Sequence, residues 1–153
     1  MSLTIQYNRE QLLDLLKCQD DPLYFINNFI KIQHPYKGVL PFDLFDHQAD
    51  LINTYKTDNK IIVKWPRQHG ETVATCAFIL WYAIFNPHRT IIISSAANVM
   101  RARDNLDIIR GMYDRLPDYL RLGLEYNNKN MIQFDNMSSI IVTAFSEHAC
   151  RRS

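Results

Sequence analysis

Residues 60–85 place a short β-branched run, a glycine-containing loop and a long apolar run in direct succession. Lys60-Ile61-Ile62-Val63 is short and bounded by a turn, which predicts a buried strand. The loop WPRQHGE follows it. Residues 72–85 are apolar on nearly every side, which predicts a helix buried on most of its faces. A strand, a loop and a buried helix in this order are typical of α/β domains.

The residues that follow continue this alternation. Asn86-Pro87 ends the long helix, and Thr90–Ser94 predicts a second buried strand. Residues 98–116 predict an amphipathic helix, with Val99, Leu106, Ile109 and Met112 facing inward. After a loop over residues 126–130, MIQF, DNMS and SIIVTAF predict a strand, a turn and a strand. The expected fold class is α/β, with a mainly parallel sheet flanked by helices.

The first third of the chain predicts helices instead. Asn8 caps an expected helix over Arg9–Cys18, with leucines 12, 13, 15 and 16 on one side. Asp21-Pro22 is a cap followed by a first-turn proline, and it opens a second helix through Ile30. HPYKGVLPF reads as an irregular link before a third helix over residues 46–56. We therefore expect an N-terminal helical region over residues 1–58 and an α/β core over residues 59–153.

Composition excludes several classes of protein. The 153 residues are 47% hydrophobic and 22% charged with a net charge of +1, which is typical of one globular domain without a strongly basic arm. Cys18, Cys76 and Cys150 form neither a CxxC nor a Cys/His cluster, so no disulfide framework or zinc site is indicated. The longest apolar run, residues 73–85, is shorter than a membrane span, and no signal peptide is evident. We expect a cytosolic protein that is not secreted.

The stretch WPRQHGET partly fits a phosphate-binding loop, GxxxxGK[ST]. In such a loop backbone amides surround the phosphates, the lysine neutralises them and the hydroxyl coordinates magnesium. Gly70 and Thr72 match the pattern, whereas Trp65 and Glu71 do not. An ordinary strand-to-helix turn, with glycine used for its backbone freedom and Glu71 favoured by the helix dipole, remains the alternative.

The likeness extends well beyond this loop. IKIQHPYKGVLPFDLFDHQADLI, VKWPRQHGET, MIQFDNMSSIIVTAF and AFSEHACRRS resemble, in order and spacing, the N-terminal ATPase domain of T4-type bacteriophage terminase large subunits. Those proteins are the motors that pump viral DNA into empty capsids. The resemblance covers essentially the whole chain and implies a partial P-loop NTPase (RecA-like, ASCE) fold.

The resemblance also implies an ATP and Mg²⁺ site. The aromatic-Gln pair that reads adenine in the family corresponds to His47-Gln48, and a glutamine amide can both donate to and accept from adenine. Thr72 corresponds to the hydroxyl that coordinates magnesium. The implied nucleotide-binding residues are His47, Gln48, Arg67, Gln68, His69, Gly70, Glu71 and Thr72.

Glu71 departs from the family's lysine. Two unit charges about 4 Å apart at an effective dielectric constant near 20 interact by about 4 kcal/mol, so a glutamate facing the phosphates would weaken nucleotide binding by orders of magnitude. Arg67, or Lys64, could supply the missing positive charge. Met137 and Arg152 stand where the family usually has glycine, and both departures are typical of altered turns.

In the family an Asp-Glu pair on a strand follows the segment that ends in RRS, and a nuclease domain comes later. The sequence ends at Ser153 without either, so we expect a terminase fragment with little or no ATPase activity alone. Asp20-Asp21 is a helix cap and no substitute for this pair. The partners implied by the resemblance are double-stranded DNA, the portal protein and the small terminase subunit, in the host-cell cytoplasm and without a membrane.

Two other functions remain open. A non-catalytic module that binds DNA, the portal or full-length terminase is suggested by Arg101, Arg103, Arg110 and Arg115, although interleaved aspartates also fit a solvated helix face. A helicase or restriction-type translocase fragment would share the loop and the glutamine, but KIQHPYKG argues against it.

Overall fold

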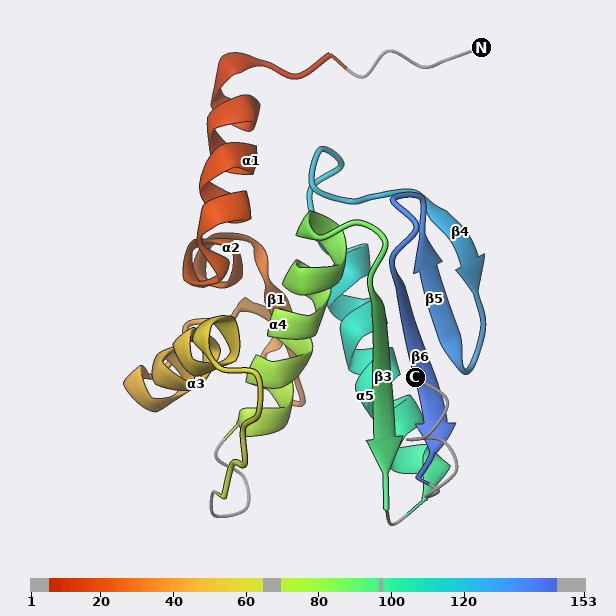
Figure 1. Cartoon of the computed structure of the whole chain (residues 1–153). Coiled ribbons are helices and arrows are strands. Elements are labelled where there is room, and N and C mark those ends of the chain that lie inside the picture. Colours follow the sequence, from red (N-terminus) through yellow and green to blue (C-terminus); the bar gives the residue numbers. More distant parts are fainter. Residues whose placement is uncertain (1–5, 65–69, 97, 146–153) are drawn as a thin grey trace.

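A computed structural model describes residues 6–64, 70–96 and 98–145 of the chain. Figure 1 shows the N-terminal helices on one side, a long central helix, and a sheet on the other side. The helices are α1 (Arg9–Asp20), α2 (Pro22–Phe29), α3 (Asp46–Thr57), α4 (Glu71–Phe85) and α5 (Val99–Asp114). The strands are β1 (Lys31–His34), β2 (Gly38–Pro41), β3 (Thr90–Ser95), β4 (Leu124–Asn127), β5 (Met131–Phe134) and β6 (Ser139–Ala144).

Local capping signals place the helices where the sequence predicts them. The Asn8 side chain accepts a hydrogen bond from the Gln11 backbone at 2.8 Å, and Asp21 accepts one from the Leu23 backbone at 2.9 Å. Asn98 caps α5 in the same way, through the Arg101 backbone at 3.0 Å. These contacts satisfy orphan amides of each first turn, so the helix starts follow from short stretches of sequence.

The four-stranded sheet is mixed, which corrects the expectation of a mainly parallel one. Its order is β3-β6-β5-β4, in which β3 pairs parallel to β6 and the other two pairings are antiparallel. Successive side chains of a strand point to opposite faces of the sheet, so only alternate residues of β3 pack inward, and Ile92 is 52% exposed. The prediction of a buried strand at residues 90–94 is therefore wrong in its burial, although its position is confirmed.

Three connecting segments also differ from expectation. Residues 60–64 form no strand, and Ile62 is 98% exposed, because no strand of the described sheet pairs with them. HPYKGVLPF is not irregular, since β1 and β2 form an antiparallel hairpin with His34 opposite Gly38. The loop predicted over residues 126–130 begins inside β4.

The hydrophobic core lies between the helices and one face of the sheet. α5 contacts β3 and β6, α4 contacts α5, and α2 and α3 contact α4 from the other side. As predicted, α4 is buried along most of its length, with Ala74, Ala77 and Leu80 fully enclosed. α1 contributes less than its leucines suggest, because Leu12, Leu13 and Leu16 are each about half exposed while Cys18 is buried.

Asp14 ties α1 to two other parts of the chain. Its carboxylate accepts hydrogen bonds from the Tyr24 hydroxyl at 2.9 Å and from the Tyr119 hydroxyl at 3.0 Å. Burial, together with the hydrogen bond to Asp14, raises the pKa of Tyr119 to about 12. The folded protein thus favours the neutral phenol.

This contact predicts a loss of stability in alkali. An unfolded tyrosine has a pKa of about 10, so the contribution of Tyr119 is complete below pH 10 or so and is lost as the pH rises toward 12. Urea unfolding at increasing pH measures it. We expect Tyr119→Phe to be less stable than the parent at neutral pH, and the difference to shrink above about pH 10. A difference independent of pH would contradict this role.

The turn between β5 and β6 holds Met137 in the left-handed region. Its φ is 68°, and its amide donates to the Phe134 carbonyl at 3.1 Å in a tight hairpin. A residue with a Cβ pays about 1 kcal/mol or more for this conformation, whereas glycine does not. The departure from glycine predicted at this position therefore coincides with real backbone strain.

Met137→Gly is expected to raise the free energy of unfolding by about 0.5–1 kcal/mol, because the strain is relieved at some cost in unfolded-chain entropy. Met137→Ala is the matched control, since it removes the half-exposed side chain but keeps the Cβ. Urea denaturation of the three proteins decides the matter. Equal stabilisation by both substitutions would attribute the effect to the side chain instead.

Candidate nucleotide site

Gly70 begins α4 in a conformation that suits glycine. Its φ is 74° and its ψ is 18°, and it is the N-cap of the helix without a side-chain cap. The first amides of α4 therefore lack the side-chain acceptor that α1, α2 and α5 have. First-turn amides without a side-chain cap, together with the helix dipole, favour an anion at this end.

Gln48 joins α3 to the start of α4. Its Oε1 accepts from the Phe45 backbone amide at 2.9 Å, and its Nε2 donates to the Gly70 carbonyl at 3.1 Å. The side chain is 2% exposed, so both contacts are shielded from water. A Cβ built at Gly70 would lie 2.4 Å from the Gln48 Nε2, so the glycine also makes room for this amide.

The structure brings three predicted site residues around one cavity. His47, Gln48 and Gly70 line a space of about 310 Å³, together with the apolar side chains of Ile32, Phe42, Phe45 and Val73. The rings of Phe45 and His47 are stacked at 5.8 Å with an interplanar angle of 7°. Sequence reasoning missed Phe45, which is 67% exposed beside this cavity. Its position directly before the helix containing His47 was the only signal available.

Glu71 and Thr72 lie at a second, smaller cavity. They line a space of about 170 Å³ with Thr75, Cys76, Ile79, Ile93 and Asn105. The Glu71 Oε2 is enclosed and has no hydrogen-bond partner among the described residues, while Thr72 is exposed. Burial raises the pKa of Cys76 to about 12, so this thiol stays neutral and is no nucleophile at ordinary pH.

The remaining predicted residues cannot be placed. Arg67, Gln68 and His69 lie outside the described residues, as do Trp65 and Arg152. Among the described residues, no group of three or more His, Cys, Asp or Glu side chains could hold a metal ion. The assignment of Thr72 to magnesium stays a prediction. None of the helices in the described ranges has the length and apolar character of a membrane span.

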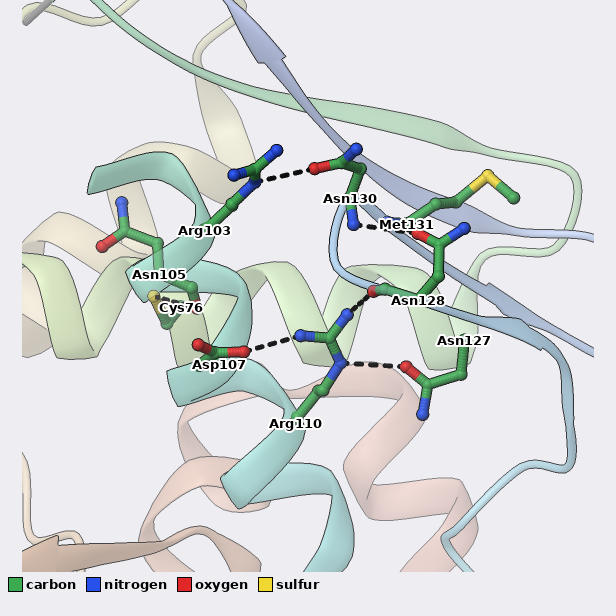
Figure 2. Close-up of polar contacts among 9 residues, drawn as sticks. All are labelled: Cys76, Arg103, Asn105, Asp107, Arg110, Asn127, Asn128, Asn130 and Met131. Carbon is green, nitrogen blue, oxygen red and sulfur yellow. Dashed lines mark hydrogen bonds and ion pairs between the residues drawn. The ribbon is translucent and has the colours of Figure 1, made fainter. Parts of the chain in front are cut away.

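The arginines of α5 hold the helix against the β4–β5 turn. Arg110 forms an ion pair with Asp107 at 2.6 Å and donates to the Asn127 side chain at 2.9 Å and to the Asn128 carbonyl (Figure 2). Arg103 donates to the Asn130 side chain at 2.8 Å. Arg115 donates to the Gln33 side chain at 3.4 Å, so three of the four arginines have hydrogen-bond partners among the described residues, which weakens the case for a DNA-binding face.

Together these features define a mixed α/β domain in which a buried glutamine links one helix to the glycine-capped start of another beside a cavity. A family model described as terminase large subunit, T4likevirus-type, N-terminal, matches residues 62–151. This match spans more than half of the chain, so the chain belongs to that family, and the resemblance inferred from the sequence is confirmed. The match places the chain in phage DNA packaging. The matched range begins at residue 62, so it does not include His47 or Gln48.

Proposed function

We propose that this chain forms the nucleotide-binding part of a DNA-packaging terminase motor, in which Glu71 impairs the site and ATP hydrolysis by these residues alone is negligible. The observation that carries the proposal is the convergence of His47, Gln48 and Gly70 on one cavity at the amino end of α4. The proposed ligands are ATP and Mg²⁺, and the proposed setting is the host-cell cytoplasm.

The cavity supplies two kinds of contact for adenine. The stacked rings of Phe45 and His47 offer an aromatic surface, and Ile32, Phe42 and Val73 offer apolar walls. Gln48 retains hydrogen-bonding capacity, because its amide has two donors and two acceptor lone pairs and its hydrogen bonds within the described part of the chain use one of each. The phosphates would then lie toward the first amides of α4, where an anion is favoured.

Hydrolysis of ATP is favoured by a positive charge at its phosphates. Glu71 replaces the lysine that would neutralise the phosphates. We therefore expect purified protein to show no magnesium-dependent ATP turnover. Measurable turnover that Arg67→Ala abolishes would overturn this part of the proposal.

A fluorescent ATP analogue tests the location of the site. Phe45→Ala should weaken binding roughly tenfold, since stacking of a base on an aromatic ring contributes about 1–3 kcal/mol. Tyr36→Ala is the control, because Tyr36 is an aromatic residue that is 94% exposed and does not line the cavity. The titration is run on the parent chain and on Glu71→Lys, in which higher affinity is expected. Equal affinities for Phe45→Ala and Tyr36→Ala would exclude this cavity.

A non-catalytic module that binds DNA, the portal or another terminase chain is the second candidate. Arg101 is exposed and could contact phosphate, whereas Arg103 donates to Asn130 in the β4–β5 turn and Arg110 donates to Asn127 at the end of β4. We expect weak DNA binding at most, which falls steeply with salt. DNA affinity that survives physiological salt would favour this module over the nucleotide site.

A further inference from the structure

A larger cavity, of about 360 Å³, lies outside the proposed nucleotide site. It lies between β1, the first turn of α4 and the second half of α5. Its walls are mainly apolar and come from Ile32, Val73, Ile108 and Met112, and Met112 is almost completely buried. A space of this size with apolar walls is within the range of small-molecule sites, which is roughly 300–1,000 Å³.

Positive charge is in excess around this cavity. Lys31 and Arg115 line it, and neither has an ion pair among the described residues. Within the described part of the chain, Arg115 donates only to the Gln33 side chain, at 3.4 Å. The one carboxylate that lines the cavity, Asp107, already forms an ion pair with Arg110 at 2.6 Å. Two cations thus face an apolar space without a matching anion.

Gly111 helps to position one of these cations. A Cβ added at Gly111 would lie 3.0 Å from the Arg115 Nη1, so the guanidinium lies close against the helix at the glycine. Arg115 is only partly exposed, and its remaining N–H groups can donate to a ligand at the cavity. A guanidinium held in this way suits a planar carboxylate or a sulfonate, because it can donate two parallel hydrogen bonds.

We propose that this cavity binds a small amphipathic anion, a carboxylate or sulfonate with an aromatic or aliphatic body. The body would occupy the apolar space beside Ile108 and Met112, and the anionic group would bind Arg115 and Lys31. The cavity shares Ile32 and Val73 with the proposed nucleotide cavity but not His47, Gln48 or Gly70. The proposed anion site therefore uses different polar side chains from the proposed nucleotide site.

The probe is anilinonaphthalene sulfonate, an aromatic anion whose fluorescence rises when it leaves water. The full chain is titrated beside Arg115→Gln and Lys31→Gln, with Arg101→Gln as the control for an exposed cation of α5 that does not line the cavity. A hydrogen bond to a charged group contributes about 1.5–3 kcal/mol, so Arg115→Gln should raise the Kd about tenfold or more. Lys31→Gln should raise it about threefold, because exposed charges contribute less.

Several outcomes separate this proposal from general dye binding. Equal affinities for the two cavity variants and Arg101→Gln would overturn it, because the dye would then be reading exposed apolar surface. Of the two cavities, Phe45 lines only the nucleotide cavity, so Phe45→Ala should leave the affinity for the dye unchanged. If it weakens the dye as much as Arg115→Gln, the dye occupies the other cavity and the proposal is wrong. Lys31 is exposed, so Lys31→Gln tests the charge even if Arg115→Gln fails to fold.

Discussion

Gly70→Ala is expected to lower the free energy of unfolding by on the order of 3 kcal/mol. About 1 kcal/mol of this comes from a Cβ in the left-handed region, where Gly70 has a φ of 74°. The rest comes from the clash of that Cβ with the Gln48 Nε2, 2.4 Å away. The amide cannot move aside cheaply, because it is buried and hydrogen-bonded at both ends.

Gly38→Ala is the matched control for this prediction. Gly38 has a similar φ of 77°, but a Cβ built there meets nothing within 4 Å. Gly38→Ala should therefore lower the free energy of unfolding only by the backbone contribution, about 1 kcal/mol. Urea denaturation of both variants separates strain from clash. Equal losses would show that the contact with Gln48 is unimportant.

A double-mutant cycle tests the contact itself. Gln48→Ala removes the amide that Gly70→Ala would strike, so the second substitution should cost at least 1 kcal/mol less in the Gln48→Ala protein than in the parent. Additive effects would contradict the proposed link between α3 and α4.

Glu71→Lys is expected to tighten the binding of an ATP analogue by at least about a hundredfold. The substitution replaces a negative charge with a positive one at the first residue of α4, next to the amides that we propose face the phosphates. The Coulomb change at an effective dielectric constant near 20 is several kcal/mol, of which screening by salt leaves roughly 3 kcal/mol. Fluorescence titration measures it directly.

Glu125→Lys is the matched control for charge. Glu125 is exposed on β4, so Glu125→Lys makes the same change in net charge at a position away from the cavity. Equal tightening by the two substitutions would indicate general attraction of the nucleotide to a more positive protein. Glu71→Lys should also lose a few tenths of a kcal/mol of stability or more, because an acidic residue is favoured in the first turn of a helix.

The elements that sequence predicted well are those fixed by local signals. α4 and α5 begin and end within a residue or two of expectation, because their caps and apolar spacing lie within the segment itself. The failures depend on distant partners. Residues 60–64 have the β-branched composition of a strand, but a strand needs a neighbour, and the described sheet offers them none. β3 was expected to be buried, but alternate residues of it are exposed.

In the candidate site, too, single residues could be predicted from local sequence, whereas the contacts between them could not. The sequence indicated Gln48 and Gly70 as separate elements of a nucleotide site, through the resemblance and the loop pattern. Their hydrogen bond, across 22 residues of sequence, and the shared cavity with Phe45 arise only from the packing of α3 against α4. The enclosure of the Glu71 Oε2, which has no hydrogen-bond partner within the described ranges, could not be predicted either, because it depends on what surrounds the first turn of α4.

The central claim is that Glu71 weakens an otherwise recognisable nucleotide site through its charge. Glu71→Gln tests this most directly, because glutamine has nearly the same size and shape as glutamate without the charge. With the fluorescent ATP analogue at fixed ionic strength, we expect affinity to rise from the parent to Glu71→Gln by about tenfold and again to Glu71→Lys. If the parent and Glu71→Gln bind the analogue with the same affinity, the claim is contradicted. This holds whether or not Glu71→Lys binds more tightly than both.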